Sequence, residues 1–150
     1  MLPGYLAWLA EMCGDIGRAQ EGLDLVDEAL ATGTRSGNHY WTAELYRLRG
    51  ALAGTEKDAE SSFVEAIALA RRQKAKSFEL RAATSLSRLW ARQGKTREAH
   101  ALLAEAYAWF TEGFDTADLK DARALLEGLE PAVPGLSSVR KEPQKPPRRR

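Results

Sequence analysis

The chain has 150 residues, of which 44% are hydrophobic and 29% charged, so it fits one small soluble domain with a modest core, and nothing in its composition suggests a second. Lys and Arg number 22 and Asp and Glu number 21, but six basic residues and one acidic residue follow Pro131. The part of the chain before this tail carries 16 basic and 20 acidic residues, a net charge of −4, so we do not expect nucleic acid as a partner. The single cysteine excludes an intrachain disulfide and a CxxC metal or redox pair.

The first predicted element is a helix over residues 3–14. It lacks the basic start of a signal peptide, contains Glu11 and is too short to cross a bilayer, so we expect a cytoplasmic protein without membrane contact. Apolar side chains surround much of this helix, whereas a terminal repeat helix normally has a polar outer face. Two readings stay open: upstream repeats precede it in a longer protein, or it packs against another chain, including a second copy. The apolar positions are Leu2, Tyr5, Leu6, Trp8, Leu9 and Met12.

A repeat is the main regular signal along the chain. A helix-ending glycine is followed at intervals of five, four and three residues by a small, a bulky and a small residue. On a helix the last three positions form one stripe, which lets a partner helix pack closely around the bulky residue. The three sets are Gly17, Gly22, Val26, Ala29; Gly54, Ala59, Phe63, Ala66; and Gly94, Ala99, Leu103, Ala106.

The helical pattern predicts an all-α fold, and its spacing resembles that of tetratricopeptide repeats. The resemblance implies a tetratricopeptide-like right-handed solenoid of about three helix pairs plus a C-terminal capping helix, over residues 1–129. Breakers at 32–38, 54–55 and 94–96 separate the helices. The second repeat has lost three residues from the end of its first helix. We expect Trp90, Phe63, Val26, Leu103 and Phe110 to be buried. The predicted helices are 3–14, 17–32, 40–53, 56–73, 76–93, 96–111 and 116–129.

Four arginines form a candidate partner-binding groove. Arg81, Arg88 and Arg92 are spaced seven and four apart on one helix face, and Arg47 lies on the preceding first helix. First helices line the groove of such arrays, and guanidinium groups suit carboxylates and phosphates. The alternative is that these side chains solvate the face or pair with Glu79 and other local acids.

No catalytic, cofactor or metal site is predicted, and we expect no enzymatic activity. Cys13 lies among apolar residues and is expected to be a small core residue. His39 is expected in a loop and His100 on a solvated helix face. Two isolated histidines with no HxxxH or HExxH spacing do not form a metal site.

The segment 109–129 is expected to close the array. Gly113 should end the sixth helix with positive φ, and Asp115 should cap the next. Phe114 should then face Leu119 as a hydrophobic staple.

After Leu129 the chain contains five of its six prolines and few bulky apolar residues, so 130–150 is predicted to be a disordered, basic tail. Three readings of this tail stay open. Its basic residues could make weak polyanion contact with nucleic acid, the tail could tether the protein to an anionic surface, or it could be an inert terminus.

The motifs "HYWTAELYRLRG", "SFELRAATSLSRLWARQGKTREAHALL" and "WFTEGFDTADLKDARALL" resemble the C-terminal tetratricopeptide-like region of bacterial multidomain class III adenylate or guanylate cyclase and predicted P-loop ATPase signalling proteins. The resemblance covers about residues 5–129. No GxxxxGK[ST] motif occurs, so neither activity carries over. It implies a non-enzymatic protein-protein interaction or scaffold module, expected as the C-terminal fragment of a larger signalling protein. The alternative is a regulatory part of a cyclase or ATPase enzyme acting on that enzyme's own domains.

Overall fold

The computed structural model describes residues 3–130 and is all-α, as predicted, with no strand in that range. The predicted tail lies almost wholly outside the described residues. Seven helices follow one another: α1 (Pro3–Asp15), α2 (Ala19–Ser36), α3 (Thr42–Ala51), α4 (Glu56–Arg72), α5 (Lys76–Arg92), α6 (Thr96–Ala108) and α7 (Ala117–Leu129).

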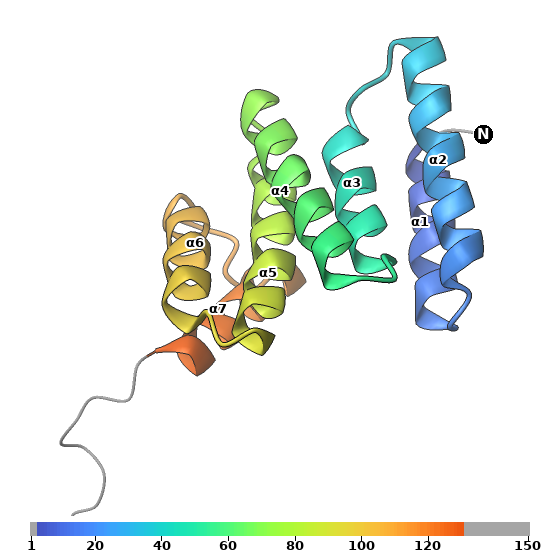
Figure 1. Cartoon of the computed structure of the whole chain (residues 1–150). Helices are drawn as coiled ribbons and strands as arrows, with labels where there is room; N and C mark the ends of the chain where they lie inside the picture. The colour runs from blue at the N-terminus through green and yellow to red at the C-terminus, as the bar shows by residue number, and fades with distance from the viewer. Residues whose placement is uncertain (1–2, 131–150) are drawn as a thin grey trace, which may run out of the picture.

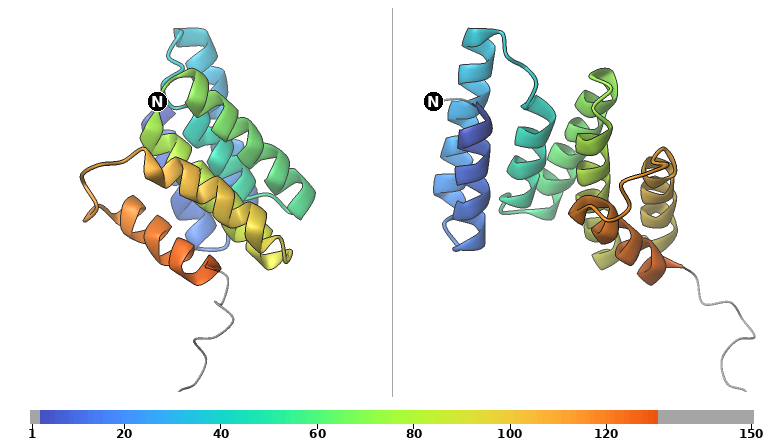
Figure 2. Two further views of the ribbon diagram at one scale, coloured as in Figure 1. Left: turned by 90° about the vertical axis from the view of Figure 1, so that its left-hand side faces the viewer. Right: turned by 180° about the vertical axis from the view of Figure 1, so that it is seen from behind.

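Successive helices run antiparallel and cross the molecule in a row (Figure 1). The helices α1 and α2, and α3 and α4, pack most extensively; α5 packs equally against α4 and α6, and α7 lies against α5 and α6. The right-hand view of Figure 2 shows α1 and α2 at one end of the row and α6 with α7 at the other. The shortened helix of the second repeat is confirmed, because α3 has 10 residues whereas α5 has 17.

The predicted stripes form the core. All nine of their positions are buried, on α2 (Gly22, Val26, Ala29), α4 (Ala59, Phe63, Ala66) and α6 (Ala99, Leu103, Ala106). Small residues here allow close approach: a Cβ on Gly22 would lie 3.0 Å from the carbonyl oxygen of Ala10 in α1. Of the five residues expected to be buried, Val26, Phe63 and Leu103 are. Trp90 and Phe110 are half-buried and pack against the core from its side.

Helix ends agree with the prediction to within about two residues, with two exceptions. The helix α2 ends at Ser36 rather than at 32, and α6 ends at Ala108 rather than at 111. The polar run after Thr32 stays helical, and two of its hydroxyls bond to carbonyls one turn earlier. Thr34 Oγ1 donates to the Leu30 carbonyl at 3.0 Å, and Ser36 Oγ to that of Thr32 at 2.9 Å. Gly37, with φ of 69°, ends the helix instead.

The turns between paired helices only partly follow the glycines. Gly17 and Gly94 have φ of 76° and 80°, as helix-ending glycines should. Gly54 does not adopt positive φ, and Thr55 instead caps α4, its Oγ1 accepting from the Asp58 amide at 3.2 Å. The left-handed residue of the α4 to α5 turn is Lys74, with φ of 55°.

The predicted cap of α7 is wrong by one residue. Gly113 does adopt positive φ, at 75°, but the N-cap is Thr116 rather than Asp115, and it makes no side-chain cap bond. Phe114 therefore does not occupy the staple position. Its ring lies against Tyr107, with centroids 5.8 Å apart, so this aromatic contact joins the loop to α6.

Candidate interaction surfaces

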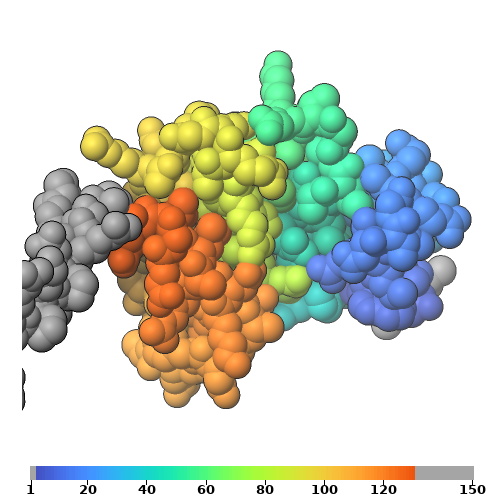
Figure 3. All heavy atoms as spheres, turned by 90° about the horizontal axis from the view of Figure 1, so that it is seen from below, coloured from blue at the N-terminus to red at the C-terminus, as the bar shows by residue number. Residues whose placement is uncertain are grey.

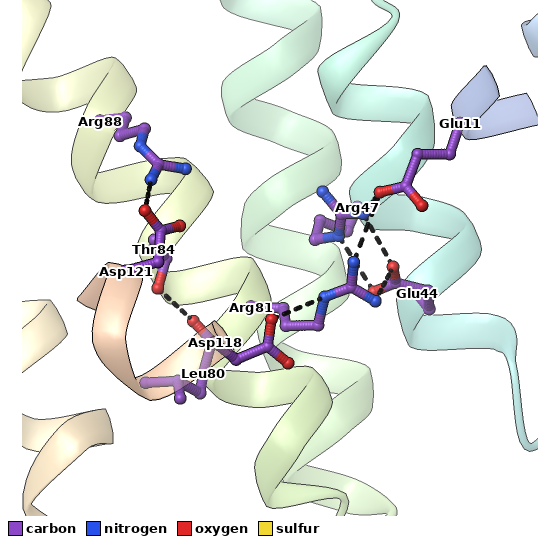
Figure 4. Close-up of polar contacts among 9 residues, drawn as sticks. All are labelled: Glu11, Glu44, Arg47, Leu80, Arg81, Thr84, Arg88, Asp118 and Asp121. Carbon is purple, nitrogen blue, oxygen red and sulfur yellow. Dashed lines mark hydrogen bonds and ion pairs between the residues drawn. The ribbon is translucent and has the colours of Figure 1, made fainter. Parts of the chain in front are cut away.

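Three of the four predicted arginines lie together on one face built by α1, α3, α5 and α7 (Figure 4). We call it the charged face. Six of its members line a cavity of about 200 Å³, and Glu44 joins them through its ion pairs with Arg47 and Arg81. The members of the charged face are Glu11, Glu44, Arg47, Arg81, Arg88, Asp118 and Asp121.

Glu44 is the centre of the charged face. Its side chain is only 4% exposed, and it accepts two hydrogen bonds from Arg47, from Nε at 3.0 Å and from Nη2 at 2.8 Å. Nη1 of Arg81 approaches the same carboxylate to 2.6 Å. A buried carboxylate needs such partners, because an unpaired charge in the interior is very costly. Glu44 therefore fixes both guanidinium groups in place.

Arg47 is charged at every accessible pH. Burial lowers the pKa of its guanidinium, but hydrogen bonds and charges from Glu44 and then Glu11 outweigh burial and leave the pKa above its ordinary value. A raised folded-state pKa contributes stability that is lost only as pH rises through that value. Arg47 therefore never loses its charge under conditions in which proteins are handled.

Carboxylates from the ends of the row complete the face. Glu11 of α1 lies 3.3 Å from Arg47 and 3.4 Å from Arg81. From α7, Asp118 lies 3.6 Å from Arg81, and Asp121 pairs with Arg88. These contacts join helices far apart in the sequence, so the charged face ties α1 and α7 to the middle of the molecule.

Arg92 is not part of this network. It is exposed and forms no ion pair within residues 3–130, and it lines a neighbouring pocket of about 410 Å³ together with Arg47 and Arg88. Glu79, the acid considered as a local partner, pairs instead with Arg71 at 3.0 Å and Lys76 at 3.2 Å.

The four carboxylates of the charged face were not predicted as site residues. Glu44 had a local signal, because Arg47 follows it by three residues on the same helix face. The other three lie on α1 and α7, and only the packing of those helices brings them near the arginines. No pattern within one helix indicates such contacts.

A second surface is apolar. Leu6, Ala7 and Ala10 of α1 are buried. On other sides of the helix and just after its end, Tyr5, Trp8, Met12 and Ile16 are exposed by 51%, 54%, 44% and 63%. We call these four residues the apolar face of α1. The helices α1 and α2 form one end of the molecule (Figure 3). The prediction that apolar side chains surround much of this helix is confirmed.

The other residues considered from the sequence lie apart from both surfaces. Cys13 is a free thiol and only partly buried, His39 is in the loop before α3 as expected, and His100 is partly buried on α6 rather than solvated. Between residues 3 and 130 no three His, Cys, Asp or Glu side chains gather as a metal site requires. None of the helices in that range is long and apolar enough to cross a membrane.

Comparisons with known proteins give one relative. No family model matches the chain, and no solved structure does. The chain is similar to an uncharacterized protein of Rhizobium meliloti (strain 1021), with 36% identity over 92 residues. The match covers 59% of this chain but 9% of that protein, so the chain spans less than a tenth of its relative's length.

Proposed function

We propose that the chain is a non-enzymatic protein-interaction module, built as a tetratricopeptide-like right-handed solenoid of three helix pairs closed by α7. The order of antiparallel helices and the buried stripes of α2, α4 and α6 support this fold. Such arrays present side chains to partner polypeptides over their length and at their ends.

The apolar face of α1 is the observation that carries the proposal. Four large apolar side chains lie exposed on one short segment. Single exposed apolar residues are common on protein surfaces, whereas a contiguous apolar patch marks an interaction site. In a helix-repeat array the natural occupant is another helix pair, which would continue the row. The partner is therefore a helical segment of another polypeptide or of a longer protein that includes this chain.

A site-specific crosslink tests this function. A photoreactive phenylalanine analogue replaces Trp8 in one protein and Arg97, an exposed residue of α6, in the control. In the native host we expect one discrete product from position 8 and none from position 97. Met12→Glu, added to the position 8 protein, should abolish the product, because a charge cannot be buried in an apolar contact. Equal yields at both positions would contradict the proposal.

A second candidate is a regulatory part of a larger cyclase or ATPase signalling enzyme. This candidate rests on the resemblance of the three quoted motifs, and the relative adds only that a similar segment forms 9% of a much longer protein. In that case the product from position 8 should contain a cyclase or P-loop ATPase polypeptide, and the module should change its turnover. A product of twice the chain's mass would instead identify a second copy as the occupant.

The exposed part of the charged face near Arg88, with neighbouring Arg92, is a further candidate groove for a partner. Arg47 and Arg81 already hold the protein's own carboxylates, so a ligand there would have to displace them. Arg88 also pairs with Asp121 but is exposed, and Arg92, which lies beside the charged face, is exposed and forms no ion pair within residues 3–130. If a partner segment binds here, the double change Arg88→Glu and Arg92→Glu should abolish its binding and leave the crosslink at position 8 unchanged.

A further inference from the structure

A pocket of about 530 Å³ lies at the edge of the row, where the loop before α3 meets the turn between α4 and α5. The side chain of Gln73 joins the two segments by donating to the carbonyl oxygen of His39 at 2.7 Å. We call this site the edge pocket. Its main lining residues are His39, Tyr40, Gln73, Lys74, Lys76 and Phe78.

One side of the edge pocket is aromatic. Tyr40 is 63% exposed and meets Phe78 edge to face, with ring centroids 5.4 Å apart. Trp41 contacts both rings, with its centroid 5.4 Å from that of Tyr40 and 5.7 Å from that of Phe78. These contacts fix the exposed face of Tyr40 as a rigid apolar platform, which can receive a bulky apolar side chain with little loss of freedom.

The other side is cationic. Lys74 and Lys76 line the pocket, and no Asp or Glu does. Lys76 is held by Glu79 at 3.2 Å and lies over the Trp109 ring at 5.7 Å. Lys74 forms no ion pair with any residue from 3 to 130. The residues before Pro131 carry a net charge of −4, so a pocket with two cations and no anion differs from the rest of the domain.

Lys74 also occupies a backbone position that is unfavourable for lysine. The turns after α1, α4 and α5 share one hydrogen-bond pattern, in which the amides of Arg18, Ala75 and Lys95 reach back five residues to the carbonyls of Cys13, Ala70 and Trp90. Two of the turns place glycine at the left-handed position, and the third places Lys74 there. Arg71 and Arg72 already supply positive charge to the last turn of α4, so the helix dipole does not require a lysine.

We propose that the edge pocket binds an acidic segment of a partner protein, with a carboxylate at Lys74 and Lys76 and an adjacent aromatic side chain on Tyr40. The chain's own tail is an unsuitable occupant, since residues 131–150 carry six bases and one acid. Nucleic acid requires a broader basic surface than two lysines provide. This site is separate from the apolar face of α1 and does not depend on it.

The experiment titrates the full-length chain with short peptides at low salt and follows the backbone amides of Ser77 and Phe78 by NMR. The probe is N-acetylated Glu-Phe-Asp amide. The matched peptides are Gln-Phe-Asn, which lacks the charge, and Glu-Ala-Asp, which lacks the ring. We expect saturable shifts with the first peptide and binding at least about fivefold weaker with each of the others, because each removes one half of the recognition.

Variants identify the residues. Lys74→Gly removes the charge and suits the left-handed backbone, so this variant should fold at least as well as the native chain. It should nevertheless bind the probe at least about threefold more weakly. Lys74→Gly with Lys76→Gln should abolish binding, whereas Lys57→Gln, on the exposed surface of α4, should not change it. The proposal is wrong if the probe causes no saturable shift, if the double variant binds normally, or if Gln-Phe-Asn binds equally well. A stronger response of the same amides to a ten-residue oligothymidine would overturn it in favour of nucleic acid.

Discussion

At the scale of single residues, the left-handed turns of α1, α4 and α5 allow a direct comparison of glycine with lysine. A residue with a Cβ in this conformation costs roughly 1 to 2 kcal/mol relative to glycine. We therefore expect Lys74→Gly to raise the free energy of unfolding by about 1 kcal/mol. The reverse change, Gly94→Lys, should lower it by a similar amount, and urea denaturation measures both. A loss of stability in Lys74→Gly would show that contacts of the Lys74 side chain stabilise the protein by more than the left-handed backbone costs.

Arg47 and Arg81 share one buried carboxylate, so their effects on stability should not add. Each single change to Met leaves Glu44 with the other guanidinium, whereas the double change leaves it buried and unpaired. A double-mutant cycle by urea denaturation should give a coupling of about 1 kcal/mol or more, with the double variant less stable than the sum predicts. In a Glu44→Gln background the coupling should disappear. Full additivity in the native background would show that Glu44 does not need both arginines.

Burial of single residues was predictable where it follows helix periodicity. The small, bulky and small stripe placed nine residues in the core correctly, because a residue on that stripe faces the partner helix whatever the rest of the molecule does. Trp90 and Phe110 were harder, since size alone suggests burial. Both lie at the margin of the core, where part of each ring stays exposed.

At the scale of helices, the contacts at their ends depend on geometry that composition does not show. Thr32 to Ser36 reads as a loop by residue type, but it is helical, with the hydroxyls of Thr34 and Ser36 donating to carbonyls four residues earlier. Asp115 is a favoured N-cap residue, yet the helix starts after Thr116. Similarly, Arg81 and Arg88 were found from spacing within α5 and Arg47 from its place on the preceding first helix, whereas the partners of these arginines on α1 and α7 depend on how distant helices pack.

Close packing of α3 against α4 depends on Gly50, a buried residue of α3. A Cβ on Gly50 would lie 2.7 Å from the ring of Phe63 and 3.0 Å from the carbonyl oxygen of Ala59. We expect Gly50→Ala to lower the free energy of unfolding by about 1 to 3 kcal/mol, because both neighbours belong to the buried stripe of α4. The control is Gly54→Ala, where no atom lies within 4 Å and φ is not positive. Thermal denaturation should leave Tm of the control unchanged or slightly higher. Equal losses would mean that glycine matters at both sites for its flexibility alone.

At the scale of the whole molecule, the core has two parts. One cluster joins α1, α2 and α3 and contains Leu45, Leu48 and Leu52, and the other joins α4 to α7 around Phe63 and Leu103. Leu52 joins the end of α3 to both α1 and α2. One of its methyl groups would lie 2.8 Å from a Cβ on Gly14 of α1, and the other would lie 2.8 Å from a Cβ on Gly22 of α2. Arrays of repeats have stabilities that are sums of local and neighbour terms. The two ends of the row should therefore respond separately to core mutations.

Native-state hydrogen exchange tests this division. Truncating a buried leucine to alanine typically costs about 2 to 5 kcal/mol, and each 1.4 kcal/mol corresponds to tenfold faster exchange through local opening. Leu52→Ala should therefore speed exchange of the α1 and α2 amides by a factor of roughly 30 or more and change those of α5 and α6 much less. The matched variant Leu103→Ala should give the converse pattern, with α5, α6 and α7 exchanging faster. If both variants accelerate all seven helices equally, the molecule opens as one cooperative unit. The end pair α1 and α2 would then be as firmly held as the middle of the row, and the ion pairs of Glu11 with Arg47 and Arg81 would be the contacts to test for that coupling.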